Sequence, residues 1–203
     1  MKKPVTSLFT SPSRATACLL FLILVHFAVN GEARRQPRVR VIGFSYSGSA
    51  CPPGSMNGTV GGGGFFIGEV RASATGGLLN RRKVCSLSFE LSYPSGWQFA
   101  VRRINIRGSA KLSSGARGTA QVRYYVSGFP GTASTSCALV GPFRGKYNLP
   151  RKFQNKVFSP CGKVRNLNVM VEARITPGTK PQKSDYVSIG GSPFTLGLHW
   201  KRC

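Results

Sequence analysis

The side chains of this sequence that could act as a catalytic acid, base or nucleophile do not form a recognised motif. Hydrolysis needs a pair of carboxyl groups, a nucleophile beside a base, or a metal ion. Beyond the first 33 residues there is one histidine, His199, and the carboxylates are Glu69, Glu90, Glu172 and Asp185. Serines are abundant, but none lies in a G-x-S-x-G motif, and no two cysteines have the C-x-x-C spacing of a zinc site.

The surroundings of these residues predict structural roles. Glu90 and Glu172 alternate with apolar residues, so we expect both on the outward faces of strands, each paired with a neighbouring arginine. Glu69 and Asp185 border loop-like segments, and His199 should face outward or line a rim. We therefore expect no catalytic residue, no metal ion and no cofactor.

Positive charge is the dominant chemical feature of the chain. The 203 residues include 29 Lys and Arg against five Asp and Glu, which gives a formal net charge of +24. Most cations therefore lack a carboxylate partner, and such an excess attracts anionic polymers. Arginine, the most frequent cation, forms forked hydrogen bonds with carboxylate, sulfate or phosphate. The candidate polyanion-binding residues are Arg81, Arg82, Lys83, Arg102, Arg103, Arg107, Arg123 and Arg174. Further cations are expected in loops: Arg144, Lys146, Arg151, Lys152 and Lys156.

The N-terminus predicts export. Lys2, Lys3 and Arg14 precede an uncharged apolar run from Ala17 to Val29, and small residues follow it. This order is typical of a secretory signal peptide, which we assign to residues 1–33. A membrane anchor is the alternative, but the run is shorter than the roughly 20 residues that span a bilayer. Residues 34–41 form a basic arm or a short propeptide, and the mature protein is expected to be extracellular, with no transmembrane segment.

Five cysteines remain after the predicted cleavage, and secretion favours disulfides. Cys51, Cys85, Cys161 and Cys203 lie in motif-like surroundings, whereas Cys137 lies in the middle of an expected strand and is the candidate for the unpaired residue. Spacing alone leaves the connectivity open. The pairing we expect is Cys51 with Cys85 and Cys161 with Cys203.

Alternation of apolar and polar residues predicts strands over most of residues 42–203. The segments 85–93, 97–108, 110–128, 166–175 and 194–203 each place apolar side chains on one face. In 97–108 the inward phase slips at Arg102–Arg103, which predicts a β-bulge. Residues 61–64 and 177–185 are expected as loops, and Asn57 is a glycosylation candidate. We predict a single all-β domain, an antiparallel sandwich held by disulfides, with a β-barrel as the alternative.

With these motifs the chain resembles the domain-of-unknown-function 4360 family of small secreted proteins. The resemblance covers residues 44–203 and rests on "CPPGS" (51–55), "CSLSFELSYPSGWQFAV" (85–101), "YYVSG" (124–128), "GPFRGKY" (141–147), "SPCG" (159–162) and "LHWKRC" (198–203). It implies secretion, a mostly β fold and a four-cysteine framework of Cys51, Cys85, Cys161 and Cys203. It implies no activity and no catalytic residues. Cys137 and the heavy arginine content depart from the family pattern.

Taken together, these features predict a secreted, cationic, non-catalytic protein that binds an anionic polymer or surface. Acidic polysaccharide of a wall or matrix is the leading ligand, with anionic lipid and extracellular nucleic acid as others. One alternative is a structural matrix protein, retained by its charge. Another is a defence protein that acts on membranes, which would require exposed apolar surface beside the charge. An enzyme with an unrecognised site is the remaining alternative.

Overall fold

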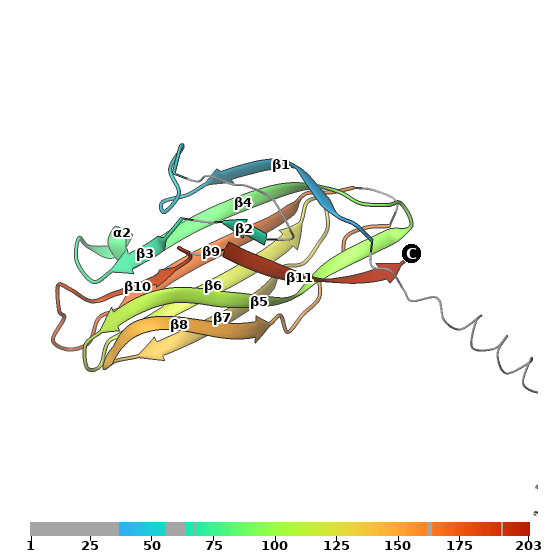
Figure 1. The fold of residues 1–203 in the computed structure, drawn as a ribbon. Helices are drawn as coiled ribbons and strands as arrows, with labels where there is room; N and C mark the ends of the chain where they lie inside the picture. The colour runs from blue at the N-terminus through green and yellow to red at the C-terminus, as the bar shows by residue number, and fades with distance from the viewer. Residues whose placement is uncertain (1–36, 56–63, 67, 162–163, 192) are drawn as a thin grey trace, which may run out of the picture. The chain divides into compact units, whose positions relative to one another are not determined.

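The computed structural model describes residues 37–55, 64–66, 68–161, 164–191 and 193–203. Within them, the compact unit Pro37–Cys203 consists of two antiparallel sheets (Figure 1). The sheets do not close into a barrel, so the predicted sandwich is confirmed. Asn57 and residues 61–63 lie outside the described residues, so the predictions of a glycosylation site and of most of the first loop are not addressed.

Sheet 1 has the strand order β1-β4-β9-β6-β7. Its strands are β1 (Arg40–Ser47), β4 (Arg82–Ser92), β9 (Leu167–Thr176), β6 (Arg117–Val126) and β7 (Ala133–Val140). Sheet 2 has the order β2-β11-β5-β10-β3, and β8 pairs with the other edge of β5. Its strands are β2 (Gly64–Phe66), β11 (Pro193–Arg202), β5 (Trp97–Leu112), β10 (Tyr186–Ile189), β3 (Val70–Ser73) and β8 (Phe143–Lys152). A single helical turn, α2 (Leu78–Arg81), joins β3 to β4.

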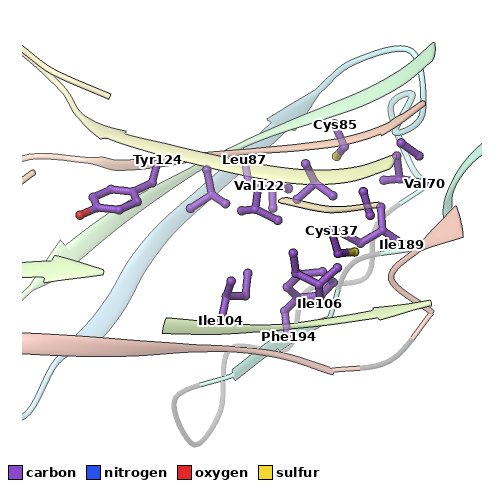
Figure 2. Packing of buried hydrophobic residues seen from close by; sticks show 14 of the residues in the cluster. Val70, Cys85, Leu87, Ile104, Ile106, Val122, Tyr124, Cys137, Ile189 and Phe194 are labelled. Carbon is purple, nitrogen blue, oxygen red and sulfur yellow. The ribbon is translucent and has the colours of Figure 1, made fainter. Parts of the chain in front are cut away.

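The core lies between the two sheets and is built from the inward row of each strand. In Figure 2, Leu87 and Val122 of sheet 1 face Ile104, Ile106 and Phe194 of sheet 2, and all five are at most 1% exposed. The alternating pattern of the sequence produces this row because successive side chains of a strand point to opposite faces. The same alternation sends most of the polar residues of the strands to the outer faces, where a ligand can reach them.

The predicted bulge in β5 is present. Gly197 of β11 pairs with Arg103, but its neighbour Leu198 pairs with Val101, so that Arg102 has no partner in β11. The extra residue shifts the inward phase, and Arg103, not Arg102, begins the outward row that continues along β5. Gly197 is required opposite this point because a Cβ there would approach the Arg103 side chain to 2.5 Å.

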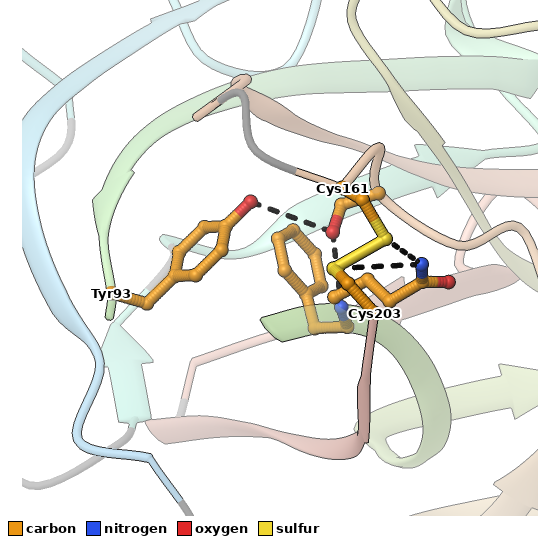
Figure 3. Close-up of a disulfide and its surroundings, with 6 residues drawn as sticks. Tyr93, Cys161 and Cys203 are labelled. Carbon is orange, nitrogen blue, oxygen red and sulfur yellow. Dashed lines mark hydrogen bonds between the residues drawn. A yellow bond between two sulfur atoms is a disulfide. The ribbon is translucent and has the colours of Figure 1, made fainter. Parts of the chain in front are cut away.

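Both expected disulfides are formed. Cys51 is bonded to Cys85 and Cys161 to Cys203, and Cys137 in β7 is free and buried. The second bond fixes the end of β11 to the segment that follows β8, close to Tyr93 (Figure 3). The Cys203 backbone N–H also donates to the Gly96 carbonyl at 3.0 Å. The last strand is therefore held by a covalent bond as well as by its ladder.

Two expectations about loops need correction. Arg144, Lys146, Arg151 and Lys152 were expected in loops, but all four lie in β8, which pairs with β5 over ten residue pairs. Asp185 ends the loop before β10 as expected, but it is 1% exposed, and its carboxylate accepts a hydrogen bond from the Ser113 backbone N–H at 3.0 Å, which compensates for its burial. No helix among the described residues has the length and apolar character needed to cross a membrane.

Candidate functional site

The outer face of sheet 2 carries a row of cations along β5. After the bulge, the inward positions of β5 are Ile104, Ile106, Ala110 and Leu112, all buried. The alternate positions hold Arg103, Arg107 and Lys111, spaced four residues apart. Since a strand rises about 3.4 Å per residue, this row extends over roughly 27 Å.

Strand β8 adds three more cations to the same face. Lys152 pairs with Arg103, and Arg144 pairs with Lys111, so like charges lie directly opposite each other at both ends of the row. Between them Lys146 pairs with Ser109. We call these six residues the cation ladder: Arg103, Arg107 and Lys111 of β5 with Arg144, Lys146 and Lys152 of β8.

In the part of the chain that the structure describes, no carboxylate offsets the cation ladder. The six described strands of sheet 2 contain neither Asp nor Glu, and within the described residues no ladder side chain forms an ion pair. Arg107 instead donates from Nε to the Asn148 Oδ1 at 3.2 Å, which directs its guanidinium across to β8. Like charges on paired strands are destabilising, so this arrangement has a cost in the folded state without a ligand.

The outer face of sheet 1 carries a second, different group of cations. Arg82 of β4, Arg123 of β6 and Arg174 of β9 converge on the carboxylate of Glu172 in β9, at 2.9, 3.9 and 3.3 Å. We call the three arginines the arginine cluster. Glu172 was expected to pair with a nearby arginine on an outward face, and it does so with three of them.

Glu172 is buried, whereas the three arginines around it are partly exposed. The Glu172 side chain is 6% exposed, whereas those of Arg82, Arg123 and Arg174 are 50%, 38% and 55% exposed. The hydrogen bond from Arg82, aided by the charges of all three arginines, lowers the pKa of Glu172 although burial acts in the opposite direction. The same hydrogen bond raises the pKa of Arg82. Glu172 therefore stays ionised and neutralises only one of the three arginine charges, so the arginine cluster together with Glu172 has a net charge of +2.

The other predicted cations join neither group. Arg81 lies in α2, and its buried Nε has no hydrogen-bond partner among the described residues. Lys83 is half-buried on the inward phase of β4, opposite Ala173, and Arg102 is exposed at the bulge. Sequence reasoning missed Lys111, whose place in the ladder follows from the continuation of the Arg103–Arg107 spacing along β5.

The candidate catalytic residues lie apart. Glu172 and Glu90 belong to sheet 1, whereas His199 belongs to β11 of sheet 2, where its ring contacts Phe158. Glu69 is paired with Arg71 at 3.9 Å. Among the described residues, no three His, Cys, Asp or Glu side chains lie close enough together to hold a metal ion.

Comparison with known proteins assigns the chain to a family. The family model for the domain of unknown function DUF4360 matches residues 37–203, which is more than half of the sequence. The chain belongs to this family. A relative from Arthroderma benhamiae, described as an uncharacterized secreted protein, is 32% identical over 154 residues, which is 72% of this chain. The chain spans 63% of the length of that relative.

The DUF4360 match includes both groups of cations. Residues 37–203 contain every strand of the two sheets, so the cation ladder and the arginine cluster both lie inside the family domain. The domain thus presents two cationic outer faces, one on each sheet, and they differ in kind. The ladder is uncompensated and linear, whereas the cluster is compact and partly neutralised.

Proposed function

We propose that this protein is a secreted, non-catalytic binding protein for an anionic polymer, and that the cation ladder is its binding surface. The observation that carries the proposal is the six cations on two paired strands of a sheet whose described strands contain no carboxylate. A linear polyanion laid along β5 and β8 would meet a positive charge at intervals over roughly 27 Å. Acidic polysaccharide of a wall or matrix is the proposed ligand class.

Two simpler explanations account for only part of the ladder. Lysine and proline on an edge strand prevent unwanted strand pairing, and β8, with Lys146, Pro150 and Lys152, is an edge strand. This device does not explain Arg103, Arg107 and Lys111, because β5 is an interior strand. Ordinary surface decoration mixes both signs of charge, which these strands do not.

Secretion and the absence of catalysis belong to the same proposal. The signal-like N-terminus, the two disulfides and the secreted relative support export. The separation of His199 from Glu90 and Glu172 supports a binding role over an enzymatic one. If an activity is found, substitution of these three residues should leave it unchanged; its loss would refute the non-catalytic proposal.

The test is salt-dependent retention on immobilised polygalacturonate. We expect the protein to elute well above about 0.15 M NaCl, since several ionic contacts must be displaced together. The ladder variant loses three charges: Arg103→Gln, Arg107→Gln and Lys152→Gln. The control variant loses three charges from exposed loops: Lys156→Gln, Lys180→Gln and Lys183→Gln.

The two variants separate a defined surface from net charge. Only the ladder variant should elute at clearly lower salt, because the control keeps the surface intact. Elution of the wild-type protein below physiological salt would refute polyanion binding. Equal shifts of the two variants would show that net charge, and not the ladder, determines retention.

A second candidate function is supported by one apolar feature. Leu78 and Leu79 of α2 are 79% and 84% exposed, and Arg81, Arg82 and Lys83 follow after Asn80. Exposed apolar residues beside cations are suited to an anionic membrane surface. Vesicles with about 30% anionic lipid attract cationic residues electrostatically. Binding to these vesicles should then be weaker in a Leu78→Ser, Leu79→Ser variant. Unchanged vesicle binding by this variant would exclude the leucine pair.

A further inference from the structure

A groove crosses the outer face of sheet 1, on the opposite sheet from the cation ladder. Its larger part, about 360 Å³, lies over β1, β4, β9 and β6, and its smaller part, about 230 Å³, lies at the arginine cluster. Met170 lines the first part and Arg123 lines the second, and these two residues are paired across β9 and β6. An Arg123 Nη1 atom lies 4.0 Å from the Met170 Sδ, so the two parts adjoin.

The larger part of the groove is uncharged, and its lining mixes polar and apolar groups. Hydroxyl groups come from two cross-strand pairs, Ser45 with Ser88 and Ser47 with Ser86, and the neighbouring strand contributes the Asn168 amide. The ring of Tyr125, 42% exposed, lines the same hollow. Hydroxyl and amide groups can each donate and accept hydrogen bonds, and an exposed aromatic ring offers a flat apolar surface. This combination suits a ligand with many hydroxyl groups and a C–H face, which is a sugar ring.

The smaller part of the groove is cationic. Glu172 occupies one side of the arginine cluster, and its burial leaves it unavailable to a ligand. Each guanidinium has five N–H donors, more than one carboxylate can accept, and the three arginines remain 38–55% exposed. Glu172 is therefore a positioning residue that holds Arg123 and Arg174 at the end of the groove, where they can bind an incoming carboxylate.

We propose that this groove binds a short stretch of a uronic-acid polysaccharide, with a sugar carboxylate at Arg123 and Arg174 and a sugar ring against Tyr125. The proposal goes beyond general polyanion binding, because recognition here comes from a shaped site with hydrogen bonds as well as from charge. It also predicts a second binding face, independent of the cation ladder.

The probe is tetragalacturonate, titrated into the protein by calorimetry and by NMR in about 0.3 M NaCl, where exposed charges are strongly screened. We expect saturable binding, with backbone shifts at Ser86, Met170 and Tyr125. Arg123→Gln should weaken binding tenfold or more, as is usual for a hydrogen bond between charged groups (about 1.5–3 kcal/mol). The fully methyl-esterified tetramer should bind about as weakly to the wild-type protein as the acid does to this variant.

Matched controls separate this site from a general effect of charge. Arg202→Gln makes the same chemical change in sheet 2, at an exposed residue outside the cation ladder and the groove lining, and should leave tetramer affinity unchanged. Tyr125→Ala should weaken both forms of the tetramer, whereas Phe129→Ala, at an aromatic ring of similar exposure (44%) outside the groove lining, should weaken neither. Circular dichroism and thermal unfolding establish that each variant is folded.

Three results would overturn the proposal. They are absence of tetramer binding at millimolar concentration, equal losses in Arg202→Gln and Arg123→Gln, and equal affinity for the acid and the ester. The second result would also show that only diffuse charge acts. Loss of resin retention in the ladder variant together with intact tetramer binding would refute neither site and would support both.

Discussion

Replacing one member of each like-charge pair in the cation ladder should stabilise the fold and weaken polymer binding at once. Lys111→Glu places a carboxylate opposite Arg144, and Lys152→Glu places one opposite Arg103. A cross-strand charge pair contributes about 0.5 kcal/mol, favourable or unfavourable according to sign, so each exchange should add about 1 kcal/mol. The double variant should therefore gain about 2 kcal/mol, which for a domain of this size raises the Tm by about 4–8 °C.

The assay is urea and thermal unfolding at low ionic strength and again in about 1 M NaCl, where the Debye length of about 3 Å removes most of the gain. The control, Lys180→Glu with Lys183→Glu in the exposed loop before β10, lowers net charge equally without facing a cation across a strand pair. A double variant no more stable than this control at low salt would refute the claim that the ladder is held at a cost to stability. Elution from polygalacturonate should move to lower salt in the double variant.

Three further predictions concern the rest of the fold. Cys203→Ser removes a disulfide between residues 42 positions apart and should lower the free energy of unfolding by about 4 kcal/mol. Without reductant, the Tm should fall by about 8–16 °C. An unchanged Tm would contradict the stabilising role of this disulfide. Burial raises the pKa of the Cys137 thiol, and the residue is 3% exposed, so a thiol reagent should label it only after unfolding in denaturant; rapid labelling of the native protein would contradict its burial. Because the pKa of Glu172 is lowered in the folded state, its stabilising contribution is present above about pH 4.3 and is lost as pH falls through the folded-state pKa. Glu172→Gln should therefore lose less stability than the wild type between about pH 7 and about pH 3, measured by urea unfolding. Equal losses in wild type and variant would contradict this linkage.

Alternation along single strands was enough to predict much of the fold. The inward rows of β4 and β9, from Cys85 to Leu91 and from Leu167 to Ile175, were visible in the sequence because each strand buries only one face. The change of phase at Arg102 was visible for the same reason, since a bulge leaves two polar residues side by side.

What sequence reasoning missed depends on pairing between distant segments. The sequence of β8 does not by itself predict a strand, because Gly145 and Pro150 interrupt it. It is a strand because β5 offers it ten consecutive partners. Likewise, Glu172 could be assigned to an outward face, but the convergence of Arg82, Arg123 and Arg174 follows from the registers of β4, β6 and β9, which single-strand patterns do not contain.

The buried free thiol has a consequence for how the chain matures in an oxidising compartment. Until β7 packs into the core, Cys137 can compete with the other four cysteines for any partner, and each wrong bond has to be reshuffled by thiol–disulfide exchange. Once the core has formed, Cys137 is buried and can no longer exchange with the disulfides of the other four cysteines. Tertiary packing therefore favours the native pairing of these four cysteines. Replacement of Cys137 by Ala should therefore increase the yield of correctly oxidised protein from a secreting host, with little change in the native state beyond the loss of one sulfur atom from the core.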